Sequence, residues 1–174
     1  MQDNFDDDDL AFFNDDLPAE SAEPAAPAEV GLVLGLSMLL ADLVTARFIA
    51  QGYHWNVRGL HFSEFHEFFG EIYLDYDSAV DPIAEDIRKL GAPAPYLLQD
   101  FVAMSQIKEE SVQSGEPELM LVSLLNINAS LLEASKVLFN VADSLNEQGI
   151  ADFLAGRIDN HKKWAWQISA TLGM

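Results

Sequence analysis

Apolar side chains recur every three or four residues along most of the chain, which is the spacing of one buried face of an α-helix. The pattern predicts four long helices, at about residues 30–57, 62–90, 117–145 and 150–172. The most regular stripe belongs to the second helix and consists of Phe62, Phe65, Phe69, Ile72, Tyr76, Ala79, Ile83, Ile87 and Leu90. Little of the sequence alternates in the manner of a β-strand. We therefore expect an all-α fold.

Glycine and proline mark the ends of these segments. Gly59 closes the first helix, residues 91–95 (Gly-Ala-Pro-Ala-Pro) stop the second, and Gly149 separates the last two. Pro117 opens the third helix, because proline is favoured in a first turn. Residues 96–105 predict a short extra helix inside the long connection between the second and third helices. The arrangement indicates a four-helix bundle with one long connection.

The first 30 residues differ in composition from the rest. They hold ten acidic residues and no Lys or Arg, with three prolines among Ala and Glu. Such a segment has too little apolar surface to fold, so we expect a disordered acidic tail at 1–30 and the bundle domain at 31–174. Five apolar residues lie among its acids: Phe5, Leu10, Phe12, Phe13 and Leu17. This acidic and hydrophobic segment could bind a basic partner protein, or the tail could do no more than keep the protein soluble.

The whole chain is acidic, with 29 Asp and Glu against 9 Lys and Arg, a net charge of −20 and a pI near 4.1. Because negative charge repels phosphate, DNA and RNA binding are disfavoured. The absence of cysteine excludes disulfides, thiolate zinc sites and a cysteine nucleophile, and it fits a cytoplasmic protein. An apolar run from Gly31 ends at Asp42 after 11 residues, about half of a membrane span, so no membrane segment is expected.

Candidate metal ligands lie beside the core stripe of the second helix. A second row of side chains, about one position beyond the stripe, consists of His66, Asp77, Asp81 and Glu85. Asp81 and Glu85 are four residues apart and face the same way, so both carboxylates could bind one cation. His54 ends the first helix, and an antiparallel turn would bring it close to His66. Imidazole with carboxylate suits iron, manganese or zinc better than calcium.

The length of the second helix limits how these residues can combine. His66 and Asp81 are 15 residues apart, or roughly 22 Å along a helix, so they cannot bind one ion within a single chain. Either they belong to separate sites, or two antiparallel chains pool them across a two-fold axis. We favour the shared site.

Several spaced motifs resemble the Dps family of mini-ferritins, the DNA-binding proteins from starved cells. The motifs are Tyr53-His54-Trp55-Asn56-Val57-Arg58-Gly59, His66 twelve residues after His54, Asp81-Pro82-Ile83-Ala84-Glu85 and Leu90-Gly91-Ala92-Pro93. The likeness spans about residues 31–172. It implies a ferritin-like subunit with a short helix in the central connection, assembled as a hollow homo-dodecamer. It also implies oxidation of Fe(II), usually by hydrogen peroxide, storage of Fe(III), and ferroxidase centres between two-fold-related subunits.

The resemblance assigns roles to individual residues. His54, with Asp81 and Glu85 of a partner subunit, would hold the firmer iron, and His66 would help to hold the second. Trp55 resembles the aromatic neighbour that could quench radicals. We expect four other residues to be structural: His61, His161, Trp164 and Trp166.

Two positions depart from the family pattern. Gly70 stands where an Asp ligand is usual, and Asp86 replaces an Arg. If His66 faces the partner's Asp81, residue numbers across the axis sum to 147, and Gly70 faces Asp77. We therefore hypothesise that Asp77 of the partner subunit reaches into the space beside Gly70.

Two functions remain open. The first is a ferroxidase that also stores iron. The second is a structural or interaction protein that retains the cage, has a degenerate ferroxidase centre and binds a partner through its acidic tail. Three acids around the start of the fourth helix, Glu147, Asp152 and Asp159, could line a pore that attracts Fe(II), or could be ordinary exposed acids.

Overall fold

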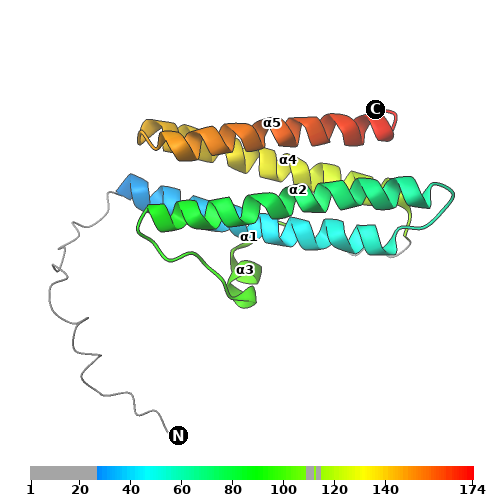
Figure 1. Cartoon of the computed structure of the whole chain (residues 1–174), viewed down its shortest axis with the longest axis horizontal. Helices are drawn as coiled ribbons and strands as arrows, with labels where there is room; N and C mark the ends of the chain where they lie inside the picture. Colours follow the sequence, from blue (N-terminus) through cyan, green and yellow to red (C-terminus); the bar gives the residue numbers. More distant parts are fainter. Residues whose placement is uncertain (1–26, 109–111, 113–114) are drawn as a thin grey trace, which may run out of the picture.

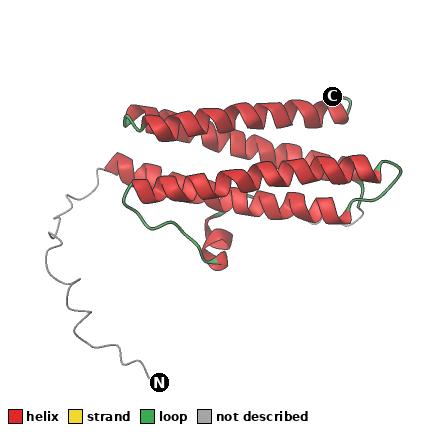
Figure 2. Ribbon diagram, viewed as in Figure 1, coloured by secondary structure: helices red, strands yellow, loops and turns green. Residues whose placement is uncertain are grey.

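The computed structural model describes residues 27–108, 112 and 115–174. This part of the chain contains five helices and no strand (Figure 1, Figure 2). They are α1 (Pro27–Asn56), α2 (Phe62–Lys89), α3 (Leu98–Met104), α4 (Pro117–Ser144) and α5 (Gln148–Thr171). The predicted all-α bundle with a short extra helix is confirmed. The predicted tail lies outside the described residues except for 27–30, which belong to α1.

Two antiparallel hairpins form the bundle. Short connections join α1 to α2 and α4 to α5, and the helices of each hairpin pack along their length (Figure 1). The connection between α2 and α4 runs back along the bundle, so that these two helices point the same way (Figure 1). Its short helix α3 packs against α1. One long crossover is the topology of ferritin-like bundles.

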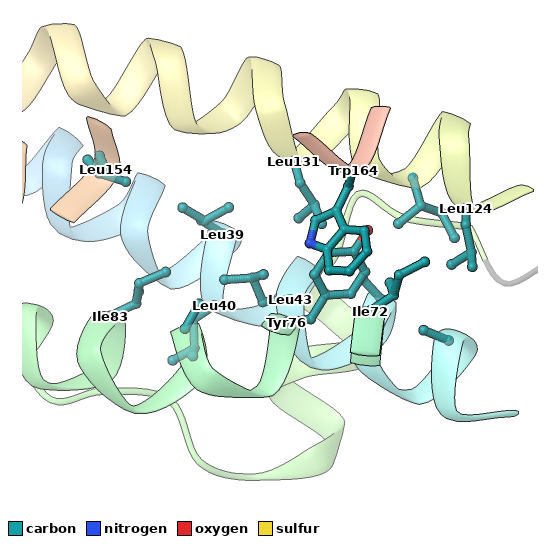
Figure 3. Close-up of a cluster of buried hydrophobic side chains, with 14 of the residues drawn as sticks. Leu39, Leu40, Leu43, Ile72, Tyr76, Ile83, Leu124, Leu131, Leu154 and Trp164 are labelled. Atoms are coloured by element: carbon teal, nitrogen blue, oxygen red, sulfur yellow. The ribbon is translucent and has the colours of Figure 1, made fainter. Parts of the chain in front are cut away.

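The predicted apolar stripes form the core. Tyr76, Phe69, Ile72 and Ile83 of α2 are fully buried, and leucines of α1 and α4 pack against them (Figure 3). Burial of such side chains contributes roughly 1.5–3 kcal/mol each. Phe62, expected in the stripe, is 43% exposed, because it lies in the first turn of α2 where no helix covers it.

Asp42 holds the long connection against α1. Its side chain is buried, and its Oδ1 accepts hydrogen bonds from Ser105 Oγ at 2.9 Å and from the backbone N–H groups of Gln106 and Ile107 at 2.6 and 3.3 Å. A carboxylate that accepts several donors satisfies backbone groups that have no helical partner. The residue that interrupts the apolar run is therefore an anchor for the segment after α3.

A second polar cluster joins α2 to α5. Asp75 receives two hydrogen bonds from Arg157, at 3.0 and 2.8 Å, and one from Trp164 Nε1 at 2.9 Å. Burial opposes ionisation of Asp75, but the hydrogen bonds and charge of Arg157, with the bond from Trp164, hold its pKa below the usual value. These long side chains fill the space between two helices that otherwise make few contacts.

His161 lies next to this cluster in the bundle interior. Its Nδ1 donates to Asn128 Oδ1 at 2.8 Å, and the Asn128 amide donates to the His161 carbonyl at 2.7 Å. Burial, with the nearby Arg157 charge, lowers the pKa of His161 to about 3, so the ring is neutral at pH 7. The expectation that His161 is structural agrees with its burial.

Two of the helices, α1 and α4, are long and apolar enough to cross a membrane by length and composition. In the bundle, 50% of the apolar stretch of α1 and 39% of that of α4 are buried. Core helices of soluble proteins have the same character, so this feature is weak evidence for a membrane protein.

Candidate metal centre

His54 and His66 form a reciprocal pair where α1 turns into α2. His54 Nδ1 lies 2.5 Å from the His66 carbonyl oxygen, and His66 Nδ1 lies 2.7 Å from the His54 carbonyl oxygen. The two rings are stacked, with centroids 3.6 Å apart and planes inclined by 21°. The prediction that the antiparallel turn brings these histidines together is confirmed.

The two hydrogen bonds fix the tautomer of each ring. A carbonyl oxygen can only accept, so each Nδ1 carries the proton and donates it. In the neutral imidazole the lone pair is then on Nε2. Metal-binding histidines are oriented in this way, with one ring nitrogen donating to a backbone carbonyl and the other free to bind a metal.

Aromatic side chains of α2 enclose the pair. The Phe62 ring stacks on His66 at 5.1 Å, and the Tyr73 ring meets His54 edge to face at 5.3 Å with an interplanar angle of 67°. Edge-to-face and offset contacts at these distances are favourable. The imidazoles are thus parts of a packed aromatic cluster.

Gly70 lies directly under the His54 ring. It is buried, and a β-carbon built on it would lie 3.3 Å from Nδ1 and 3.4 Å from Cε1 of that ring. A side chain at this position would therefore be in tight contact with the His54 ring of the same protomer, which would have to shift by a few tenths of an ångström. The structure provides no carboxylate from position 70.

The candidate carboxylates Asp81 and Glu85 are exposed on α2. Over the residues that the structure describes, no three His, Asp or Glu side chains of one protomer come together in a metal-binding group. The histidine pair offers two imidazole nitrogens, and within one protomer it lacks the anionic ligands that an iron centre needs.

Asp77 has a partner that the sequence did not suggest. Its Oδ1 lies 2.8 Å from Nε of Arg47 on α1, and about half of the Asp77 side chain is exposed. Arg47 shares the α1 face that also carries His54. In a metal site, Asp77 would have to share its carboxylate with Arg47 or release it.

Most of the other residues to which the sequence assigned a role in the site lie on the surface of the protomer. Trp55 is 63% exposed. Asp152 and Asp159 are exposed on α5, and Glu147 is half-buried just before that helix. Asp86, which replaces an expected Arg, is buried and paired with Lys89 at 2.9 Å.

The two C-terminal tryptophans differ from each other. Trp164 is buried and hydrogen-bonded to Asp75, as a structural residue should be. Trp166 is 68% exposed, so the prediction that it packs is wrong for the single protomer, because it lies on the outer face of α5.

The sequence reading missed Tyr73 and the Asp75 cluster. His66, Gly70 and Tyr73 follow a spacing of four and three, which places them on one face of α2. The same kind of spacing on α5 brings Arg157, Asn160 and Trp164 together, and all three donate to Asp75. Both spacings can be seen in the sequence. Neither reveals its role by itself, because the residue contacted, His54 or Asp75, lies on another helix.

Comparisons with known proteins agree with this fold. A family model described as a ferritin-like domain matches residues 34–174. A DNA protection during starvation protein of Porphyromonas gingivalis is 29% identical over 142 residues, which are 80% of this chain and 87% of the relative. An uncharacterised protein of Haemophilus influenzae is 30% identical over 135 residues, covering 78% of this chain and 84% of the relative.

Solved structures show the same fold. The Dps protein of Vibrio cholerae, described as a member of a broad superfamily of ferritin-like diiron-carboxylate proteins, has a TM-score of 0.80 and 28% sequence identity. The match covers 83% of this chain and 91% of that protein. The chain belongs to the ferritin-like proteins and, among them, to the Dps family.

Proposed function

We propose that this chain is a mini-ferritin that binds Fe(II), oxidises it with hydrogen peroxide and stores the Fe(III) in a cytoplasmic homo-dodecameric cage. The centre is pooled between two-fold-related subunits. His54 and His66 come from one subunit, and Asp81 and Glu85 come from its partner. Iron is the substrate and the cargo of this protein.

The observation that carries the proposal is the reciprocal pairing of His54 and His66. Each Nδ1 donates to a carbonyl oxygen, which leaves the lone pair of each stacked ring on Nε2. Imidazole nitrogen with carboxylate oxygen is a suitable donor set for Fe(II). The two hydrogen bonds and the ring stacking hold the imidazoles in this orientation, so little conformational entropy would be lost when a metal binds.

The pooled site follows from the helix length. The distance of about 22 Å between His66 and Asp81 on α2 exceeds any coordination sphere. An antiparallel α2 from a two-fold partner brings the carboxylates to the imidazoles, and symmetry then creates two equal sites.

The reaction balances with peroxide as the oxidant. Two ferrous ions each lose one electron, and hydrogen peroxide takes up both electrons and two protons. Its O–O bond breaks, and two water molecules form. The protein contributes ligands that hold the ferrous ions near each other, and it separates the ferric product from solution.

The acidic surface supports iron entry and argues against DNA as a partner. With a net charge of −20, the chain attracts cations and repels phosphate. Glu147, Asp152 and Asp159 would line the entry path. The tail of residues 1–30 would serve solubility or bind a basic partner.

One observation favours the alternative, a cage with a degenerate centre. The His54 ring occupies the space next to Gly70, and no carboxylate is available there. The second iron position would then have one anionic ligand fewer than in the family pattern. In this case the protein would act as an assembled scaffold with slow turnover.

Iron oxidation by the assembled protein separates the two functions. Anaerobic Fe(II) followed by peroxide should give ferric absorbance well above the rate in buffer. His54→Ala and Glu85→Ala should abolish this excess, and Glu133→Ala, on the exposed face of α4, should not. A stable cage with no rate above buffer would reject the ferroxidase and favour the scaffold.

A further inference from the structure

Tyr73 on α2 brings an oxidisable phenol against the histidine pair. Its half-buried ring meets the His54 imidazole edge to face, with the ring centroids 5.3 Å apart. His54 is the ligand assigned to the firmer iron position of the proposed centre. An electron can therefore pass between the phenol and an iron bound to His54 through two rings that are in contact.

The other three tyrosines have different surroundings. The Tyr53 hydroxyl donates to Ser123 of α4 at 2.9 Å. Tyr76 is fully buried in the core, where burial raises the pKa of its phenol. Tyr96 is 80% exposed on the connection after α2. Contact with a candidate metal ligand thus distinguishes Tyr73 from the rest.

Trp55 is the competing electron donor, because it follows His54 directly in the sequence. Its ring is 63% exposed, and in the part of the chain that the structure describes it makes no ring contact with His54 or His66. Tyr73 has a more protected place. In the register in which residue numbers across the two-fold axis sum to 147, position 73 lies beside the axis, so α2 of the partner subunit would cover it.

The glycine at position 70 leaves the centre short of one electron when iron is scarce. Because this position contributes no carboxylate, the second iron position has one anionic ligand fewer than the family pattern and should fill later. A centre with one ferrous ion can give one electron, whereas reduction of hydrogen peroxide to water takes two. One-electron reduction alone would release a hydroxyl radical.

We propose that Tyr73 supplies the second electron when a single ferrous ion in the centre meets hydrogen peroxide. This inference rests on the proposed function, because it adds an electron donor to the same ferroxidase centre. It also assigns to the chain a means of using peroxide safely although the carboxylate at position 70 is missing.

The step balances in atoms and electrons. The O–O bond of peroxide breaks and two water molecules form. Fe(II) gives one electron and becomes Fe(III), and Tyr73 gives one electron with its phenolic proton and becomes a neutral tyrosyl radical. The solvent supplies the second proton. The next ferrous ion returns an electron to Tyr73, which regains a proton from solvent, so two ferrous ions are still oxidised for each peroxide.

Rapid-freeze electron paramagnetic resonance tests this step. The assembled protein receives one Fe(II) per centre in the absence of oxygen, and peroxide is then added. The parent should give a tyrosyl radical signal that narrows when the tyrosines are ring-deuterated. Tyr73→Phe keeps the ring but lacks the phenolic hydroxyl, so this signal should disappear. A spin trap should then capture several-fold more hydroxyl radical than with the parent.

Tyr96→Phe is the matched control, because it removes the same hydroxyl from an exposed tyrosine on the connection after α2. It should leave both the radical signal and the spin-trap yield unchanged. Co(II) binding, measured by calorimetry, reports the centre without any oxidation. Tyr73→Phe should bind Co(II) as tightly as the parent, since the ring that contacts His54 remains.

The outcomes distinguish this proposal from the function on which it rests. If the parent oxidises iron and Tyr73→Phe keeps the tyrosyl radical and the parental spin-trap yield, the role of Tyr73 is wrong and the ferroxidase centre remains. If the radical is lost in Trp55→Phe and kept in Tyr73→Phe, the electron comes from Trp55 and the proposal is overturned. If the parent itself oxidises no iron above the rate in buffer, the ferroxidase fails, and the electron donor fails with it.

Discussion

His54 and His66 each donate from Nδ1 to the other's backbone carbonyl, over 2.5 and 2.7 Å. This reciprocal pair links the last turn of α1 to the first turns of α2 and sets both rings in one tautomer. An Nδ1 donor bond to a backbone carbonyl is also the arrangement that orients metal-binding histidines in other proteins.

The Asp77 hypothesis predicts a measurable effect on iron oxidation. If Asp77 of the partner subunit supplies a carboxylate next to Gly70, Asp77→Ala should lower the oxidation rate several-fold. Arg47→Gln should raise the rate, because it frees Asp77 from the 2.8 Å ion pair. Ser78→Ala, at the neighbouring exposed position, is the control. An Asp77→Ala rate equal to that of the parent discards the hypothesis.

The Asp75 cluster should contribute strongly to stability. Asp75→Ala leaves the guanidinium of Arg157, only 5% exposed, without its carboxylate. Breaking a buried ion pair in this way costs about 3–5 kcal/mol. Urea unfolding measures the loss, with Glu133→Ala, which breaks an exposed pair with Lys136, as the control. Equal unfolding midpoints for the two variants would show that the cluster adds little.

The buried His161 should make the protein sensitive to mild acid. Its pKa is about 3 in the folded state, whereas the unfolded chain has the usual value of 6.5. The unfolded state therefore binds more protons between these values, and stability falls as the pH drops below 6.5, by at most about 1.4 kcal/mol per pH unit. Asp75, with a pKa below 3.8, adds nothing to this slope above pH 5.

Denaturant unfolding between pH 7 and 5 measures that slope. His161→Gln should flatten it, even if the variant is less stable at pH 7. A parental stability that does not change over this range would contradict the assignment.

Two exposed acids of α5, Asp152 in its second turn and Asp159 near its middle, predict a salt-dependent entry step. A double variant, Asp152→Asn with Asp159→Asn, should slow iron oxidation at low ionic strength and have little effect at high ionic strength, because salt screens attraction between exposed charges. Its Co(II) affinity should equal that of the parent. A rate that is unchanged at low salt would assign these residues to the ordinary acidic surface.

Most of the fold could be predicted from the sequence, because helical periodicity is a local signal. Gly59 and Pro117 mark helix ends as expected, whereas the prediction that Gly149 separates the last two helices is wrong: Gly149 lies inside α5, and the chain turns at residues 145–147, where Asn146 has a φ of 60°. The core stripe of α2 is buried between Phe69 and Ile87, and it is only partly buried or exposed at its ends, at Phe62, Phe65 and Leu90. The closeness of His54 and His66 followed from a short antiparallel turn. That inference needed no knowledge of distant contacts.

The parts that sequence reasoning missed depend on partners far along the chain. Asp42 meets Ser105 across 63 residues, and Asp75 meets Arg157 across 82. Neither carboxylate has a neighbour in sequence that reveals its role. For Gly70 the sequence showed that a carboxylate was absent, whereas the structure showed that the His54 ring packs closely against this glycine.

The central claim is that the metal centre is pooled between subunits, and mixed assemblies test it most directly. His54→Ala and Glu85→Ala proteins are dissociated, mixed in equal amounts and reassembled, and peroxide-dependent iron oxidation is measured. In a two-fold dimer of one variant with the other, one of the two sites regains both residues. Random mixing then restores about a quarter of the sites, and we predict about a quarter of the parental rate. A mixture no faster than either variant alone would contradict the shared centre.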